Sequence, residues 1–344
     1  MDLTGKNVWQ VAAGDNQRQY DDICLHYQVM MIGPGERGPF DEDTYRDVPS
    51  SSKNAVRRFY SGPRRGDVAL LRLGTSRVLA VGEVVGDSPT HVEEFGDIDG
   101  WRLQHCWPVR WTKVEKTFEP GTFRGRFGRV NHSEVLKWAR AFTYPKEART
   151  PTPSDLPTDT GQLGDEELGA LLVKSGMSVE RVAQVLTARE SLHPLIQWLR
   201  EQGATRSGRP SEHETISYLV VPLLFSLGWS QKTLAIEWNN IDIALFPEPT
   251  HRGAHPTCGI EVKSLDRSVF APRKQATGHA ERRGWDRFII TDGARYACFK
   301  KHGEQYALSS YLNIARLRRR YPVYDDRAGG HCGGAVDALL TIAR

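Results

Sequence analysis

Three residues in the second half of the chain have types and a spacing suited to phosphodiester chemistry. The segment GIEVKSL, residues 259 to 265, places Glu261 and Lys263 on one face of an expected strand. Asp242 precedes them in the apolar run NNIDIALF, where a lone carboxylate is costly unless it has a partner. Two converging carboxylates suit Mg²⁺, and a neighbouring lysine can orient a water or stabilise charge on a phosphate. The alternative for Glu261 and Lys263 is a surface ion pair.

The surrounding pattern predicts the elements that would position these side chains. Ser211 is a plausible N-cap for a helix with the sequence EHETISYLVVPLLFSLGW. Strands over 239–246 and 258–265, a helix, and two further strands joined by a turn then follow. This order predicts an α/β arrangement in which a hairpin brings Asp242 and Glu261 together.

These residues and their surroundings resemble the PD-(D/E)XK nucleases. The pattern D-xn-ExK, the helix ending PLLFSLGW and the segment QATGHAERRGWDRFIITDGARYACF look like the N-terminal branch of type I restriction subunits, over residues 211 to 300. The resemblance implies that Asp242 and Glu261 bind the metal and that Lys263 is the catalytic lysine. It also implies that Gln275 approaches the site and that Glu212 is the helix acid. Glu212 is preferred for that acid because it is in line with the apolar residues on the inward face of the helix. Glu214 is the second choice.

The same resemblance implies the cofactor. We expect Mg²⁺, for which Mn²⁺ could substitute. The motif GxxxxGK[ST] is absent from the sequence, so we expect no use of ATP or GTP. His279 stands where a tyrosine is commoner in the family, but that position is not a ligand.

The first 143 residues contain short apolar runs separated by Gly, Pro and Asp, which predict a compact, mainly β domain. The runs VWQVAAG, CLHYQVMMIGPGERG, AVRRFYSGPRRGDVALLRLG and WPVRW resemble the EVE branch of the PUA-like superfamily, which is related to YTH domains. That resemblance implies a small β-barrel that holds a flipped, modified base in an aromatic pocket. Pro34 stands where relatives often carry a tryptophan, which leaves one wall of the pocket open to question.

The base-pocket candidates are aromatic residues for which core packing is the alternative reading. They are Trp9, Phe59, Tyr60, Trp101, Trp107 and Trp111. The candidate contacts to DNA phosphates are the nearby arginines Arg57, Arg58, Arg64 and Arg65.

Composition along the chain predicts a multidomain α+β protein. A PUA-like domain is expected over 1–143, a Pro-rich linker over 144–164, a small helical spacer over 165–205 and the nuclease domain over 206–344. The net charge of +4 says little about partners, but residues 102–140 and 266–320 are locally basic. Ordinary solvated faces would show the same charge pattern.

Five scattered cysteines without metal-binding spacing predict a reduced, cytoplasmic protein. The most apolar run, YLVVPLLFSLGW, is shorter than a membrane span needs, so no membrane association is expected.

Together these features predict a modification-dependent DNA endonuclease of the type IV restriction kind. It would flip a modified base, with 5-methyl- or 5-hydroxymethylcytosine as the first expectation, and hydrolyse double-stranded DNA with Mg²⁺. A homodimer is expected because one such site cuts one strand. Two alternatives remain open: a nucleic-acid-binding module with a non-catalytic nuclease fold, and a nuclease acting on RNA or damaged DNA.

Overall fold

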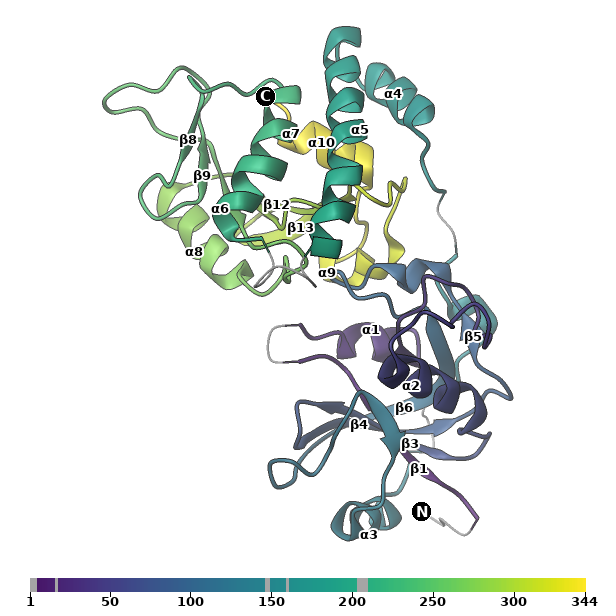
Figure 1. Ribbon diagram of the computed structural model, residues 1–344. Helices are drawn as coiled ribbons and strands as arrows, with labels where there is room; N and C mark the ends of the chain where they lie inside the picture. Colours follow the sequence, from purple (N-terminus) through teal and green to yellow (C-terminus); the bar gives the residue numbers. More distant parts are fainter. Residues whose placement is uncertain (1–4, 16–17, 146–148, 159–160, 203–209) are drawn as a thin grey trace. The chain divides into compact units, whose positions relative to one another are not determined.

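The computed structural model describes residues 5–15, 18–145, 149–158, 161–202 and 210–344, which form two compact units (Figure 1). One unit is Met1–Thr158 and the other is Asp159–Arg344, so the boundary falls inside the predicted linker. Each unit combines a β-sheet with helices. The chain is therefore a mixed α+β protein, as the sequence predicted.

The first unit is built on a curled seven-stranded sheet (Figure 1). Its strands are β1 (Val8–Ala12), β2 (Val29–Ile32), β3 (Val68–Leu73), β4 (Arg77–Val84), β5 (Thr90–His91), β6 (His105–Thr117) and β7 (Phe127–Arg129). The order is β2-β6-β4-β3-β1-β7, with β5 paired to β6. Only the pair β1 and β3 is parallel among these named strands. The apolar runs of the sequence form these strands.

Helices complete the first unit. They are α1 (Asp21–His26), α2 (Ser50–Ser61) and α3 (Ser133–Ala141), with 3₁₀ turns η1 (Glu93–Gly96) and η2 (Pro153–Asp155). Helix α2 was not predicted from the sequence. It buries Val56 and Phe59, three residues apart, and turns the adjacent Arg57 and Arg58 to solvent. The helical period therefore separates residues that stand side by side in the sequence.

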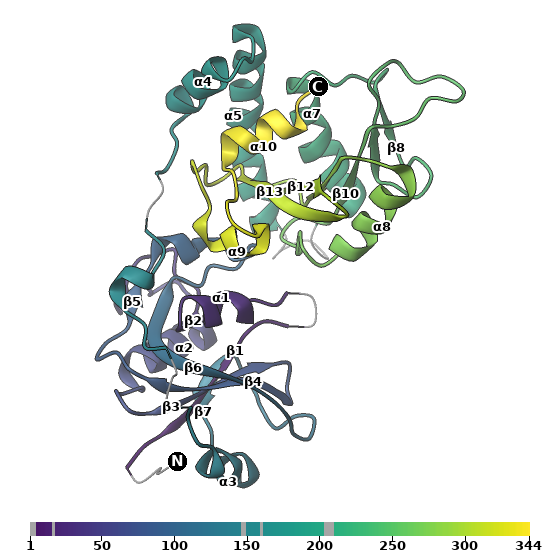
Figure 2. The same cartoon turned by 180° about the vertical axis from the view of Figure 1, so that it is seen from behind.

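The second unit contains a six-stranded sheet (Figure 2). Its strands are β8 (Leu234–Ile236), β9 (Ile243–Leu245), β10 (Cys258–Val262), β11 (Arg287–Thr291), β12 (Arg295–His302) and β13 (Gln305–Asn313), in the order β13-β12-β11-β10-β9-β8. Strands β10 and β11 are parallel and are joined by helix α8 (Arg273–Arg283), whereas the other pairs are antiparallel. The predicted strand and helix order is present, with shorter strands.

Successive side chains of each strand in this sheet point to opposite faces, and helices cover both faces. One face packs against α4 (Asp165–Lys174), α5 (Val179–Gln202), α7 (Val221–Ser226) and α10 (Ala335–Ile342) in a single apolar core. On the opposite face, α8 contacts β10 and β11. There the Trp285 ring covers Gly259, where a Cβ atom would lie 2.2 Å from the ring. The helices predicted as a spacer over 165–205 are therefore part of the second unit's core.

The helix predicted over 212–229 is interrupted by a wide turn. The chain forms α6 (Glu212–Thr215), the π-helical turn η3 (Ile216–Val220) and then α7. Pro222 has no backbone N–H, so the α-helical bond to residue 218 cannot form there. The N–H of Val221 instead donates to the carbonyl of Ile216, five residues back. The C-terminal region adds the 3₁₀ turn η4 (Pro322–Tyr324) and helix α9 (Asp325–Ala328).

Across the described ranges, none of the helices has both the length and the apolar character required to span a bilayer.

Candidate functional site

Glu261 and Lys263 lie together at the end of β10. Glu261 is the last residue but one of β10, and Lys263 is the first residue after the strand. The ammonium Nζ of Lys263 lies 2.8 Å from Glu261 Oε1, as their shared face predicts. The same Oε1 atom accepts a hydrogen bond of 3.1 Å from Gln275 Nε2, which comes from helix α8. Three residues expected at the site therefore meet at one carboxylate oxygen.

Asp242 is held against the same strand. It stands just before β9, and its Oδ2 accepts the backbone N–H of Val262 at 2.6 Å. The preceding loop places Glu237, Asn239 and Asn240 in the left-handed region, with φ between 50° and 63°. Such backbone is uncommon outside glycine and persists only where its surroundings enforce it. The Arg283 guanidinium contributes by donating to the carbonyl of Asn239 at 3.1 Å.

Glu212 completes the group from the start of α6. Its Oε1 lies 3.5 Å from Lys263 Nζ. The alternative acid, Glu214, is occupied in a capping box: its side chain accepts the Ser211 N–H at 2.8 Å, and the Ser211 hydroxyl accepts the Glu214 N–H. The cap therefore holds Glu214 at the helix start and leaves Glu212 to face the lysine.

Burial and neighbouring charge act in opposite directions on this cluster. Glu261 is only 6% exposed, and burial raises the pKa of its carboxyl group, with Asp242 and Glu212 adding to the rise and Lys263 opposing it. Burial lowers the pKa of Lys263, but its bond to Glu261 and the nearby acids outweigh burial, so the net shift of that pKa is upward. The lysine is therefore a fixed positive charge among three carboxylates.

The donor chemistry of the carboxylates bears on whether they can hold a metal ion. The described residues contain no group of three or more His, Cys, Asp or Glu side chains arranged to hold an ion. Mg²⁺, however, commonly uses one or two carboxylates and completes its octahedron with water and substrate phosphate. The Asp242 carboxylate lies close enough to Glu261 to add to the rise in the pKa of Glu261. This oxygen pair suits Mg²⁺ of that kind.

A buried ion-pair network supports the loop that follows Lys263. Asp292, in the TDG turn between β11 and β12, is fully buried and accepts hydrogen bonds from the Arg295 guanidinium and from the Asp266 N–H at 2.9 Å. Arg200 of α5 pairs in turn with the Asp266 carboxylate at 2.9 Å. This role could not be predicted from a local pattern, because the partners come from three separated segments of the chain.

Four of the six aromatic residues predicted for a base pocket lie in the core of the first unit. Trp9, Phe59, Trp107 and Trp111 are each 5% exposed or less. The indole N–H of Trp107 donates to the Phe59 carbonyl at 2.7 Å, and that of Trp111 donates to the Val29 carbonyl at 3.0 Å. These rings are packing residues in this structure: Trp9, Trp107 and Trp111 point into the core from strands, and Phe59 lies on the buried face of α2.

Tyr60 and Trp101 are the candidates that remain partly exposed. The Trp101 ring packs edge-on against Tyr20, with the Arg18 guanidinium 5.7 Å from its centre. The Tyr60 ring lies 5.7 Å from Phe40 and 5.3 Å from the His105 ring. Tyr60 therefore stands in an aromatic group that includes His105, a residue the sequence analysis did not select.

His105 fixes the orientation of Tyr60. Its Nε2 lies 2.9 Å from the Pro34 carbonyl, which can only accept, so this nitrogen carries the proton. Its Nδ1 then accepts from the Tyr60 hydroxyl at 3.0 Å. Burial lowers the pKa of His105 to about 4, with His91 adding to the effect and the bond to Pro34 opposing it. A neutral imidazole therefore locks one partly exposed ring in place.

Gln104, the neighbour of His105, carries a buried polar group without a partner. Its side chain is fully buried, and both amide atoms lack a hydrogen-bond partner among the described residues. A Cβ atom on Gly35 would lie 2.5 Å from its Oε1, so only glycine fits beside it. An orphaned amide costs free energy unless a water or ligand pairs with it.

The predicted phosphate contacts divide into two pairs. Arg57 bonds to Glu42 through Nε at 2.5 Å, and Arg65 pairs with Asp87 at 3.2 Å. The bond to Arg57 lowers the pKa of the Glu42 carboxyl group to about 2. Arg58 and Arg64 are exposed, and no ion pair is recorded for them within the described residues. Arg58 and Arg64 are thus the better placed of the four to meet a phosphate.

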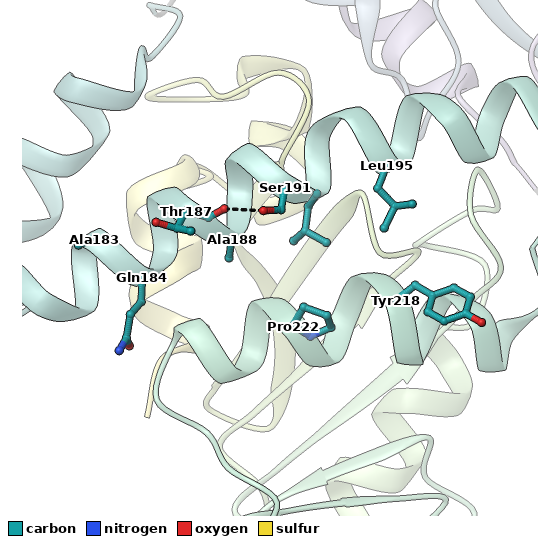
Figure 3. A pocket seen from close by; sticks show the side chains of 9 residues that line it. Ala183, Gln184, Thr187, Ala188, Ser191, Leu195, Tyr218 and Pro222 are labelled. Carbon is teal, nitrogen blue, oxygen red and sulfur yellow. Dashed lines mark hydrogen bonds between the residues drawn. The ribbon is translucent and has the colours of Figure 1, made fainter.

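A separate groove lies between α5 and the π-helical turn with α7 (Figure 3). It has a volume of about 530 Å³ and is lined by Ala183, Gln184, Thr187, Ala188, Ser191, Leu192, Leu195, Tyr218 and Pro222. None of these lining residues is a carboxylate or a lysine. The groove is therefore distinct from the cluster around Glu261.

Comparison of the chain with protein-family models, curated proteins and solved structures finds no match. The basis for a function is therefore the geometry of the acid and lysine cluster and of the aromatic group around Tyr60.

Proposed function

We propose that this chain is a Mg²⁺-dependent endodeoxyribonuclease that acts on double-stranded DNA carrying modified bases, in the manner of type IV restriction. The observation that carries the proposal is a convergence of side chains from helices α6 and α8, from the end of strand β10 and from the loop before β9. These side chains are Glu212, Gln275, Glu261, Lys263 and Asp242. A surface ion pair would need only two of these residues. Within the proposal, the second unit is a PD-(D/E)XK domain.

Each residue has a role in this chemistry. Asp242 and Glu261 would hold Mg²⁺, which supplies Lewis acidity and a more acidic bound water. Lys263 lies where its charge can stabilise the negative charge that develops on the scissile phosphate. Gln275 orients the Glu261 carboxylate, and the Val262 N–H orients that of Asp242. Glu212 keeps the lysine charged and directed into the cluster.

The first unit would select the DNA, as a PUA-like domain does when it accepts a flipped base. Tyr60 offers a rigid flat surface on which a flipped base can stack. Modified cytosine is the proposed base. A single site of this kind cuts one strand, so cleavage of both strands would require two copies of the chain.

The proposal is tested by incubating the protein with plasmid that is unmodified or carries 5-methylcytosine, 5-hydroxymethylcytosine or 6-methyladenine, with Mg²⁺ or with EDTA. Cleavage of cytosine-modified DNA in Mg²⁺ alone is expected. Equal cleavage of every plasmid would contradict modification dependence. Binding without cleavage would favour a non-catalytic module, and preferential cleavage of parallel RNA or damaged-DNA substrates would favour the other alternative.

A further inference from the structure

A second polar cavity lies in the second unit, between α10 and the sheet. It has a volume of about 360 Å³ and is lined by Arg287, Lys300, Ser309, Ser310, His331, Gly333, Asp337, Leu340 and Thr341. Arg287, Lys300 and Ser310 come from three adjacent strands. The register pairs Arg287 with Lys300, and Ser310 with Cys298, so their side chains share the sheet face that α10 covers.

This cavity is separate from the acid and lysine cluster. Arg287 begins β11, whereas Lys263 bonds to Thr291 at the other end of that strand. Four residues of strand separate the two ends by about 13 Å. Glu261 also lies on the opposite face, where it meets α8. A ligand in the cavity would therefore not share contacts with the proposed catalytic residues.

The floor of the cavity contains polar groups whose partners are weak. Ser310 is 1% exposed, and neither its hydroxyl nor the buried Nε of Arg287 reaches a nitrogen or oxygen partner among the described residues. Two buried thiols interact with them instead, that of Cys298 with Ser310 and that of Cys258 with Arg287. Thiols are weak hydrogen-bonding groups. The structure thus places a buried hydroxyl and a half-buried guanidinium against a polar volume.

The charges around the cavity favour an anion. Arg287 and Lys300 line it, and no ion pair is recorded for either within the described chain. The one carboxylate present, Asp337, accepts the Gly334 N–H at 3.1 Å and is held by that bond at the start of α10. A guanidinium, an ammonium and a hydroxyl are the donor set that matches a phosphate group.

We propose that this cavity binds a phosphate monoester, with Arg287 as the principal contact and Ser310 and Lys300 as further donors. The volume admits a group larger than orthophosphate. The ligand is therefore either a free mononucleotide or the terminal phosphate of a DNA strand. This site would be additional to the proposed nuclease site, and it does not depend on that function being correct.

The test measures binding to the full chain in EDTA, so that no cleavage can occur. Inorganic phosphate and thymidine 5′-monophosphate are titrated by calorimetry at constant ionic strength, with chloride as the reference salt. Arg287→Gln is expected to weaken binding about 10-fold or more, and Ser310→Ala about 5-fold. Lys301→Ala is the matched control, because this exposed lysine follows Lys300 but points to the other sheet face. It should change affinity less than about 2-fold.

The source of the phosphate is decided by comparing a 5′-phosphorylated oligonucleotide with its unphosphorylated form. Tighter, Arg287-dependent binding of the phosphorylated strand would assign the site to DNA ends, and exclusive binding of the mononucleotide would assign it to a free ligand. Circular dichroism checks that Arg287→Gln is folded, and Ser310→Ala supplies a second, smaller change. Wild-type affinity in both variants, or an equal loss in Lys301→Ala, would overturn the proposal.

Discussion

In the proposed mechanism, Lys263 has the most specific chemical role of any single residue. Its ammonium lies between Glu261 and Glu212, at 2.8 Å and 3.5 Å, and these acids raise the pKa of Lys263 although burial opposes the rise. Electrostatic groups aimed at a reacting phosphate act on the transition state more than on binding. Replacement of this side chain should therefore affect the rate of cleavage more than DNA affinity.

Lys263→Met is expected to lower kcat for DNA cleavage by about 10²-fold or more while leaving KM within about 3-fold. The methionine keeps the apolar stem and removes the charge. Single-turnover cleavage of modified plasmid measures the effect, with Lys301→Met as the control. A variant that cleaves at the wild-type rate would remove Lys263 from the mechanism.

His105 makes the stability of the first unit depend on pH. Burial lowers the pKa of His105 to about 4 from an ordinary value of 6.5, so the unfolded chain takes up a proton before the folded chain does. The stabilising contribution is complete above pH 6.5 and is lost as the pH falls towards 4. Its full size is about 3 kcal/mol.

We therefore expect amides of β2 and β6 to lose hydrogen-exchange protection between pH 6.5 and 4, after correction for intrinsic exchange rates. His105→Gln should flatten this dependence, because glutamine does not titrate. His302→Gln, at an exposed position, is the control. An unchanged pH dependence in His105→Gln would show that other groups govern it.

At the scale of elements, the turn between β11 and β12 supports the end of β10. The Lys263 N–H donates to the Thr291 carbonyl at 2.8 Å, and the next residue, Asp292, receives the Asp266 N–H and the Arg295 guanidinium. The turn also needs Gly293, with φ of 82°, since a Cβ atom there would lie 2.7 Å from Leu219. This turn thus joins the strand that precedes Lys263 to the helical segment that begins at Glu212.

Asp292→Asn is expected to destabilise the second unit by about 3 kcal/mol, because the buried guanidinium of Arg295 loses its carboxylate partner. Denaturant unfolding followed by far-UV circular dichroism measures this loss. Asp286→Asn, at an exposed position just before β11, is the comparison and should change stability by less than about 0.5 kcal/mol. Equal midpoints for the two variants would contradict a supporting role for the turn.

At the scale of the whole molecule, the two units would divide selection from cleavage. The acid and lysine cluster contains only residues of the second unit, and the group around Tyr60 contains only residues of the first. Substitutions in one unit should therefore affect one activity and spare the other.

Tyr60→Leu is expected to reduce the preference for modified DNA by about 5-fold or more, because stacking on a base contributes about 1 to 3 kcal/mol. Metal-dependent cleavage of any DNA that does bind should persist. Tyr60→Phe keeps the ring but loses the hydrogen bond to His105, so its preference for modified DNA should lie between those of the wild type and Tyr60→Leu. Competition binding with modified and unmodified oligonucleotides gives the preference, and an unchanged preference in Tyr60→Leu would locate base recognition elsewhere.

The sequence by itself predicted which side chains form the acid and lysine cluster. The alternation that places Glu261 beside Lys263 is a property of a single strand, and the apolar run around Asp242 makes an isolated carboxylate improbable. The order of the elements from β9 to β12 follows from equally local patterns, whereas helix α2 of the first unit was not predicted. The boundary between the units also falls where proline and polar residues exclude a core.

Only the tertiary structure decided which aromatic rings are buried. In the sequence, the tryptophans Trp9, Trp107 and Trp111 could equally belong to a binding pocket or to a core. In the structure each ring is buried, and each indole N–H donates a hydrogen bond within the core. Tyr60 differs because His105, which orients it, comes from a strand far along the chain. The cavity around Arg287 likewise depends on three strands and a helix meeting. Burial and hydrogen-bond partners are non-local, and so no window of sequence contains them.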